Sequence, residues 1–308
     1  MQTLEQFPNG LTRLPPWFKQ ELPDMEKIRG MQKMFRDSKL HTVCESAKCP
    51  NMGQCWGAGV ATFMILGEVC TRACRFCAVK AGRPMNVDPD EPRNIAEAVK
   101  ALNLRYVVIT SVARDDMPDE GAGHFYQTIQ HVRRISPQTK IEVLIPDFSN
   151  KTESIQRLVE ARPEVVSHNI ETVRKISPRI RPQADYDRSL EVLKNFKTLS
   201  PGIFTKTSFM LGLGETREEI LETMRDILKT GCDILTIGQY LAPTQLKRHL
   251  PVEKFYTPEE FNELKTTGEA TGFKYVMSGP LVRSSFIAEE GYKVVFNKLS
   301  LRAQRSNL

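Results

Sequence analysis

The stretch that decides the fold runs from residue 60 to residue 80 and reads VATFMILGEVCTRACRFCAVK. Its first part, VATFMILG, is a short apolar run of the kind that forms a fully buried β-strand. Cys70, Cys74 and Cys77 follow on one short segment, separated by three and by two residues. Thiolates are soft ligands suited to a metal ion or an iron–sulfur cluster. We therefore expect a buried strand that leads directly into a metal-binding loop.

The number of ligands on this loop is informative, because structural zinc and fully ligated clusters normally take four. Three ligands either borrow a distant residue or leave one metal open to a small molecule. The spacing C-x3-C-x2-C, with Phe76 before the last cysteine, resembles the signature of the radical S-adenosylmethionine (SAM) superfamily. The resemblance implies a [4Fe-4S] cluster on Cys70, Cys74 and Cys77 whose fourth iron binds SAM and cleaves it to a 5′-deoxyadenosyl radical. The alternative for CRFC alone is a thioredoxin-like redox pair or half of a zinc ribbon.

Composition sets the class of protein. The 308 residues are 40% hydrophobic, enough for a full core. No apolar run approaches the ~20 residues of a membrane span, and the first residues lack a secretory signal, so we expect a cytoplasmic protein without a membrane partner. Seven cysteines in such a chain favour metal ligands over disulfides. The net charge of +6 is spread along the chain, which does not indicate nucleic acid; an acidic protein partner fits about as well.

A second cysteine triplet precedes the first. Cys44, Cys49 and Cys55 are separated by four and by five residues, and turn formers such as Pro50 and Gly53 lie between them. The two triplets could form one six-thiolate site. Two separate clusters, each lacking one protein cysteine, are the simpler interpretation.

From residue 60 onward, apolar runs alternate with amphipathic segments. We expect strands at 60–67, 105–113, 140–148, 164–171, 202–214 and 233–241, and helices at 94–104, 121–135, 152–161, 186–199 and 216–231. Thr216 and Glu219 predict a capping box for the last of these helices, and Gly231 its C′ residue.

This order predicts an α/β protein with a parallel sheet and right-handed crossovers. A closed eight-unit barrel needs about 250 residues or more, so six units suggest an open, partial (β/α)6 TIM-like barrel. Function in such barrels lies at the carboxyl ends of the strands, where the Cys70 to Cys77 loop begins. We divide the chain into an N-terminal extension with the first cysteine triplet (1–58), the radical SAM partial barrel (59–242) and a C-terminal extension (243–308) with a helix and a short strand.

Several motifs together resemble the lipoyl synthase family. They are HTVCESAKCPN, CTRACRFC, SHNIET, FMLGLGE, QYLAPT and SGPLVRSS, and they span His41 to Ser285. The resemblance implies an auxiliary [4Fe-4S] cluster on Cys44, Cys49, Cys55 and the second serine of RSS, Ser285. That cluster is consumed to insert sulfur at C6 and C8 of an octanoyl chain on a carrier lysine. It also implies an octanoylated lipoyl carrier domain as partner, either a 2-oxoacid dehydrogenase E2 or a glycine cleavage H protein, and a low-potential electron donor such as ferredoxin or flavodoxin.

Ser285 has a physical rationale as a ligand. An alkoxide is harder and more basic than a thiolate, so protonation could release it and expose an iron and its sulfides. The alternative is an ordinary turn or helix cap. Arg283 would be either a charge partner of the cluster or a surface residue. The family usually has tyrosine after RSS and this chain has Phe286, which leaves open what positions that segment.

The resemblance also assigns a SAM site at the strand ends. Asn169 and Glu171 would face one way on a strand and meet the ribose hydroxyls. The remaining assignments are Thr110 and Ser111 for the amino group, Arg181 for the carboxylate, and Gly212 and Gly214 for a backbone contact to adenine. Each has a structural alternative, such as a satisfied core amide for Asn169 or a strand-to-helix turn for GLGE. The five histidines show no ligand pattern and are expected to be structural or exposed.

Two other functions compete with this interpretation. A methylthiotransferase also combines two clusters, but its auxiliary cysteines lie in a separate N-terminal domain and an RNA-binding module usually follows. A non-catalytic iron–sulfur carrier or zinc module would need neither a six-unit barrel nor two sites that each lack a cysteine.

Overall fold

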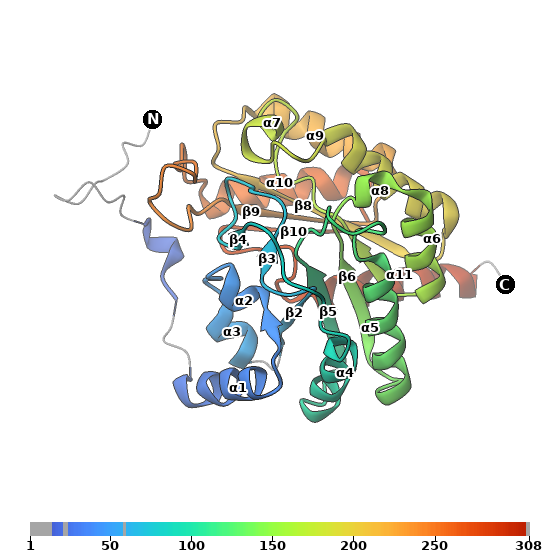
Figure 1. The fold of residues 1–308 in the computed structure, drawn as a ribbon. Helices are drawn as coiled ribbons and strands as arrows, with labels where there is room; N and C mark the ends of the chain where they lie inside the picture. Colours follow the sequence, from blue (N-terminus) through green and yellow to red (C-terminus); the bar gives the residue numbers. More distant parts are fainter. Residues whose placement is uncertain (1–13, 21–23, 58–59, 306–308) are drawn as a thin grey trace.

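One eight-stranded sheet organises the chain in the structure, a computed structural model that describes residues 14–20, 24–57 and 60–305 (Figure 1). The strands follow the order β1-β2-β5-β6-β7-β8-β9-β10. They are β1 (His41–Thr42), β2 (Thr62–Ile65), β5 (Tyr106–Ser111), β6 (Lys140–Leu144), β7 (Val165–Ser167), β8 (Phe204–Leu211), β9 (Ile234–Gln239) and β10 (Tyr275–Gly279).

Helices connect successive strands on the outside of the sheet (Figure 1). They are α4 (Glu91–Ala101), α5 (Ala122–Ile135), α6 (Thr152–Ala161), α8 (Tyr186–Leu199), α9 (Arg217–Lys229) and α10 (Pro258–Thr271). The predicted helices at 152–161 and 186–199 are confirmed at both ends. The capping box is confirmed too, since Thr216 accepts from the N–H of Glu219 and Glu219 bonds back, and Gly231 takes the left-handed φ of +80°.

The sheet is open, as predicted for a partial barrel. From β2 to β10 neighbouring strands pair in parallel, and β1 adds to β2 in antiparallel orientation. Within the described part of the chain, β1 and β10 form the two edges of the sheet.

One feature differs from the expectation. The C-terminal segment does not leave the strand–helix order at residue 243, because α10 crosses back and β10 pairs with β9 over Tyr275 to Gly279. The sequence predicts a short strand here but not its pairing with β9. As an edge strand, β10 is only partly buried and lacks the continuous apolar pattern of a central strand.

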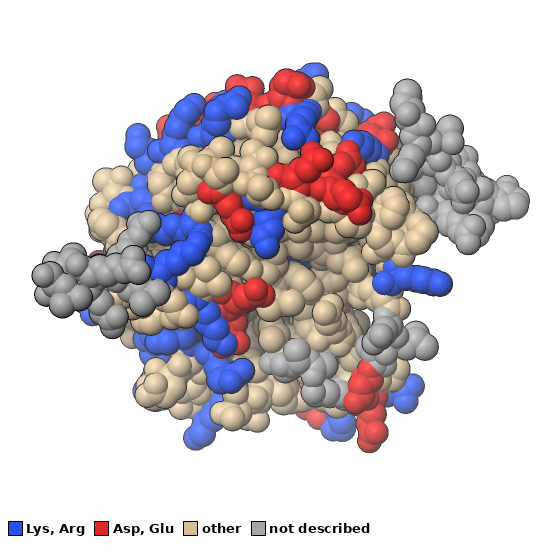
Figure 2. Space-filling view, turned by 180° about the vertical axis from the view of Figure 1, so that it is seen from behind, with Lys and Arg blue, Asp and Glu red and all other residues tan. Residues whose placement is uncertain are grey.

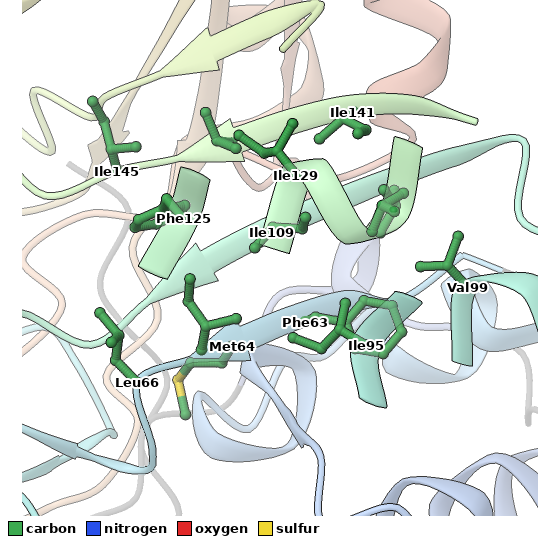
Figure 3. Close-up of a cluster of buried hydrophobic side chains, with 14 of the residues drawn as sticks. Phe63, Met64, Leu66, Ile95, Val99, Ile109, Phe125, Ile129, Ile141 and Ile145 are labelled. Carbon is green, nitrogen blue, oxygen red and sulfur yellow. The ribbon is translucent and has the colours of Figure 1, made fainter. Parts of the chain in front are cut away.

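The described residues form three buried hydrophobic clusters, and alternate residues of β5 contribute to two of them. Val107 and Ile109 face outward into the layer between the sheet and α4 and α5, where Ile95 and Phe125 fill the space (Figure 3). Tyr106 and Val108 face the other way, into a cluster that includes Tyr292 and Val295 of α11 (Ala288–Arg305). The last helix therefore covers the inner face at one end of the barrel.

The N-terminal segment packs on the first edge of the sheet. It contains the short 3-10 turn η1 (Pro16–Phe18), followed by α1 (Met25–Asp37), α2 (Val43–Ser46) and α3 (Met52–Gly57). Phe35 of α1 packs edge-on against Trp56 and Phe63, with ring centroids 5.5 and 5.6 Å apart. The first cysteine triplet is thereby fixed against the body of the barrel.

None of the described helices is long and apolar enough to cross a membrane. Basic and acidic side chains are interspersed over the rear face, in agreement with the evenly spread charge of the sequence (Figure 2).

Candidate active site

A cavity of about 1160 Å³ opens at the carboxyl ends of the parallel strands. Its wall brings together most of the predicted site residues, namely Cys44, Cys49, Cys70, Cys74, Cys77, Thr110, Ser111, Asn169, Glu171, Arg181 and Ser285. Cys55 lines a smaller hollow that shares Cys44, Cys49 and Ser285 with the cavity. Gly212 and Gly214 are not part of either wall.

The cysteine loop leaves the barrel through a short ribbon of β3 (Val69–Cys70) and β4 (Lys80–Ala81). The backbone N–H groups of Arg72 and Ala113 point at the sulfur of Cys70, at 3.4 and 3.3 Å. Both donors are backbone groups, so they hold the sulfur of Cys70 in one position at the start of the loop.

Two other segments hold the same loop. The amide of Gln183 accepts from the N–H of Ala73 at 2.7 Å and donates to the carbonyl of Thr71 at 3.2 Å. The ring of His249 is hydrogen-bonded through Nε2 to the carbonyl of Cys77 at 3.0 Å. The loop is thus fixed by residues far apart in sequence, which limits the movement of its thiols.

Arg72 anchors the loop from inside. Its guanidinium donates to Asp115 at 2.6 Å and to Asp147 at 2.7 Å, and Arg188 donates to the other oxygen of Asp147 at 2.9 Å. Burial alone would raise the pKa of Asp147, but the hydrogen bond and charge of Arg72 lower it well below its ordinary value. Asp147 is therefore a buried carboxylate that links the loop to α8.

The first cysteine triplet converges with the RSS segment. The small hollow is lined by all three cysteines together with Arg283, Ser285 and Phe286. Asn51 ties the two segments by donating from Nδ2 to the carbonyl of Leu281 at 2.5 Å. Arg283, expected to be either a charge partner of the cluster or a surface residue, lies close enough to Cys49 to interact electrostatically, and burial lowers the pKa of this arginine.

The free thiols are costly to ionise. Burial raises the pKa of Cys55 and of Cys74 to about 12 and that of Cys77 to about 11, and each is raised further by neighbouring cysteines. A bound metal lowers the pKa of its thiol ligands again and holds them as thiolates. Six free cysteines, of which Cys44 is buried and the other five are half-buried, form the two groups that such a site requires.

The donor sets fit clusters in kind and number. In the part of the chain that the structure describes, no three His, Cys, Asp or Glu side chains are arranged to hold one metal ion. A [4Fe-4S] cluster makes a different demand, since it takes one ligand for each of its irons. Three thiols with a hydroxyl around the small hollow supply four ligands. Three thiols on the cysteine loop supply three, which leaves one iron for a small molecule.

The deeper wall of the cavity contains buried polar atoms without a partner among the described residues. They are Ser111 Oγ, His168 Nε2, Asn169 Oδ1 and Arg181 Nη2. Orphaned buried polar atoms are costly unless a ligand satisfies them. Arg181 is 3% exposed and donates through its other nitrogens to Ser177 Oγ and the carbonyl of Asn169. This mixture of donors and acceptors fits the carboxylate, ammonium and hydroxyl groups of SAM.

Asn169 and Glu171 are brought together, but not on a regular strand. The strand β7 ends at Ser167. Beyond it, the hydroxyl of Thr207 takes the place of backbone–backbone hydrogen bonds to β8: it donates to the carbonyl of His168 and accepts from the N–H of Ile170. Glu171 then has a left-handed φ of +69° and accepts from Asn169 Nδ2 at 3.1 Å. The expected period-2 strand over these two residues is therefore wrong, although their proximity is confirmed.

Gly212 and Gly214 have a local role. The carboxylate of Glu215 accepts from the N–H groups of Gly212 and Leu213, at 2.6 and 2.9 Å. Gly212 has a φ of +105°, and a side chain there would collide with Gln239. The N–H of Gly212 is thus used inside the turn, and the backbone contact of Gly212 and Gly214 to adenine stays a prediction.

Sequence reasoning missed several parts of the wall. His168 was expected to be structural or exposed, yet it lines the cavity with an unpartnered Nε2. The segment between β9 and α10 also lines the cavity, at residues 241–247 and 249–252. Its sequence predicts a basic turn at 243–251 and has no helix or strand periodicity that would mark it as part of a site.

Comparisons with known proteins agree with this geometry. The pattern of the Radical SAM superfamily matches residues 64–227, more than half of the chain. Streptococcus suis SuiB bound to S-adenosylmethionine has a similar fold at 14% identity, with a TM-score of 0.53 over 83% of this chain and 61% of that one. HydG, a maturase of the [FeFe]-hydrogenase, is similar at 13% identity, with a TM-score of 0.52 over 75% of this chain and 57% of that one. Fold and site together define a radical SAM protein, a class whose cofactors are SAM and an iron–sulfur cluster.

Curated relatives narrow the family. The pattern described as the N-terminal domain of lipoyl synthase matches residues 4–49. Lipoyl synthase of Rubrobacter xylanophilus is 53% identical over 276 residues, 90% of this chain and 85% of that protein. Lipoyl synthase of Bacillus subtilis is 52% identical over 279 residues, 90% of this chain and 93% of that protein. The chain belongs to the lipoyl synthase family.

Proposed function

We propose that this protein inserts two sulfur atoms, at C6 and C8, into an octanoyl chain that is amide-linked to a carrier lysine, and so forms the lipoyl group. One observation carries the proposal. A single cavity has Cys74 and Cys77 in one part of its wall and Cys49 and Ser285 in another. A substrate chain inside it would have access to both cysteine sites, as a reaction that couples radical formation to sulfur transfer requires.

The first site would generate the radical. Cys70, Cys74 and Cys77 would hold a [4Fe-4S] cluster, which with bound SAM supplies a 5′-deoxyadenosyl radical for hydrogen abstraction. Arg181 would bind the methionine carboxylate through its unpartnered Nη2, since arginine suits carboxylates. The other contacts proposed to SAM are Thr110 and Ser111 to the amino group and Asn169 and Glu171 to the ribose.

The second site would supply sulfur. Cys44, Cys49, Cys55 and Ser285 would hold an auxiliary [4Fe-4S] cluster, the second of the two. The position of Ser285 in the same hollow as these cysteines supports its role as fourth ligand. Its hydroxyl is a poor match for a soft cluster, so Ser285 would leave readily on protonation.

The roles of the domains and the partners follow from the two proposed cluster sites. Residues 1–58 and 243–308 would contribute the auxiliary ligands, and 59–242 the radical site; residues 1–13, 21–23 and 58–59 lie outside the described structure. The reaction needs a lipoyl-domain substrate and a reductant. We propose an octanoylated E2 or H protein and a ferredoxin or flavodoxin. The cytoplasmic location stays a prediction.

Two measurements test the function. Iron and sulfide analysis of anaerobically purified protein should give about eight irons per chain, and zinc in their place would contradict the proposal. Incubation with SAM, a strong reductant and an octanoyl-lysine peptide should then add two sulfurs to the peptide, detected by mass. Cleavage of SAM with no gain of sulfur would reject the assignment.

A further inference from the structure

The charges around the cavity mouth are uneven. Among the charged residues of the wall, Lys48 and Lys247 are exposed and both are cations. The carboxylates of the wall lie inside: Asp147 is fully buried, and burial raises the pKa of Glu171. The cavity therefore presents positive charge to an approaching molecule while its acids stay enclosed.

One short segment supplies much of this charge. Residues 244–249, which we call the rim segment, follow β9 in the loop drawn in orange in Figure 1. Leu246 is 61% exposed, and Lys247 and Arg248 are exposed beside it. Thr244 closes the segment through its hydroxyl, which accepts from the N–H of Leu246 at 3.2 Å and bonds His249 Nδ1 at 2.7 Å.

The backbone of the rim segment is fixed to the cysteine loop. Arg75 donates to the carbonyls of Arg248 and Lys247, at 3.1 and 3.3 Å, and accepts from the N–H of Leu250. Because these carbonyls face the loop, the side chains of Leu246, Lys247 and Arg248 are left outside. An exposed apolar residue beside two cations on a rigid backbone is a preorganised contact surface, not a mobile loop.

The proposed function requires contact at this place. A lysine-linked acyl chain can enter the cavity, but the folded domain that carries it cannot. The surface of the carrier domain around the modified lysine must then contact residues at the mouth of the cavity.

We propose that the rim segment docks an acidic surface of the carrier domain next to its octanoylated lysine. Leu246 makes the apolar contact, and Lys247 and Arg248 attract carboxylates. This inference rests on the proposed function and adds the chemistry of the partner. Rim charges act mainly on association and selectivity and are screened by salt, which makes them separable from the reaction itself.

The test uses two octanoyl-lysine peptides, one flanked by glutamates and one by lysines. Their dissociation constants are measured on the anaerobic two-cluster enzyme, without turnover. The glutamate peptide should bind about fivefold more tightly at low salt, and the difference should shrink at high salt. Lys247→Glu and Arg248→Glu should each reduce or invert this ratio. The matched control is Lys194→Glu, an equal charge change at an exposed position on α8.

Three results would overturn the proposal: equal binding of the two peptides, an equal effect of Lys247→Glu and Lys194→Glu, or displacement of the glutamate peptide by a short single-stranded RNA. The octanoylated carrier domain should also bind both rim variants more weakly than the parent, and whichever of the two variants affects the glutamate peptide more should affect the carrier domain more. Failure of the proposed function looks different, because the peptide would bind with the expected charge preference and gain no sulfur.

Discussion

The backbone carbonyl of Val282 occupies the space where a side chain on Gly238 would begin. Gly238 lies in the buried strand β9, so the segment that leads to Ser285 can cross the barrel only because this residue has no Cβ. Gly238→Ala should push residues 282–285 outward and remove Ser285 from the auxiliary cysteines. The auxiliary cluster would lose its fourth ligand and be held less tightly, so we expect the iron content to fall below about eight per chain while the other triplet keeps about four.

Gly202 provides the control for this substitution. A Cβ there meets no atom within 4 Å, and Gly202→Ala should leave the iron content unchanged. Full iron loading of Gly238→Ala would show that the crossing does not hold the auxiliary site.

Asp147 should matter for the stability of the cysteine loop. Asp147→Asn leaves Arg72 and Arg188 without their shared buried anion, and breaking a buried pair in this way costs about 3–5 kcal/mol. Urea unfolding under anaerobic conditions measures the loss. Asp187→Asn breaks a pair whose carboxylate side chain is 65% exposed and should cost less than about 1 kcal/mol. Equal losses would contradict this role of Asp147.

His168 should make stability depend on pH. Burial lowers its pKa to about 4 in the folded chain, whereas the unfolded value is about 6.5. Below about pH 6.5, His168 binds a proton in the unfolded chain but stays neutral in the folded chain. The free energy of unfolding therefore falls as pH drops toward 4. Between pH 7 and pH 5 the loss from this group is about 2 kcal/mol.

The variant His168→Asn isolates this contribution. Asparagine can keep the hydrogen bond that His168 Nδ1 makes to the carbonyl of Ile145, but it does not titrate. Its urea unfolding should therefore change less between pH 7 and pH 5 than that of the parent, by the same about 2 kcal/mol. Parallel pH profiles for the two proteins would refute the assignment.

Local patterns made most of the fold predictable. The helices at 152–161 and 186–199 and the capping box at Thr216 depend on residues close in sequence, and the cysteine loop has its own spacing. Contacts between distant segments were not predictable in this way. The pairing of β10 with β9 and the passage of Val282 over Gly238 join residues about 40 positions apart, and no local periodicity marks them.

The same division applies to the site. The six motif cysteines, Asn169, Glu171 and Arg181 were found through motifs. The structure brings all of them except Cys55 to one cavity, and Cys55 lines the adjoining small hollow. His168 was missed because a lone histidine has no spacing to read; only its unpartnered Nε2 in the wall identifies it. Gly212 was also found through its motif, and its backbone N–H donates to Glu215 within the turn.

Arg181 should contribute to SAM affinity. Its Nη2 has no partner among the described residues, and a hydrogen bond to a charged group is worth about 1.5–3 kcal/mol. Arg181→Met should therefore weaken SAM binding by about 10- to 100-fold in equilibrium dialysis. Arg179→Met, at an exposed position two residues away, should bind SAM like the parent. Equal dissociation constants for both variants would exclude the proposed carboxylate contact.

Ser285 tests whether a weak ligand is needed to release sulfur. Ser285→Cys replaces a hydroxyl with a thiolate, which a soft iron holds more tightly, so the auxiliary cluster should be retained. If the stronger bond adds about 1.4 kcal/mol to the barrier, sulfur transfer slows about tenfold while SAM is still cleaved. The measurement is the ratio of lipoyl product to 5′-deoxyadenosine in one turnover. Ser284→Cys, the neighbouring wall position, controls for an added thiol. An unchanged ratio in Ser285→Cys would mean that release of this ligand does not limit the reaction.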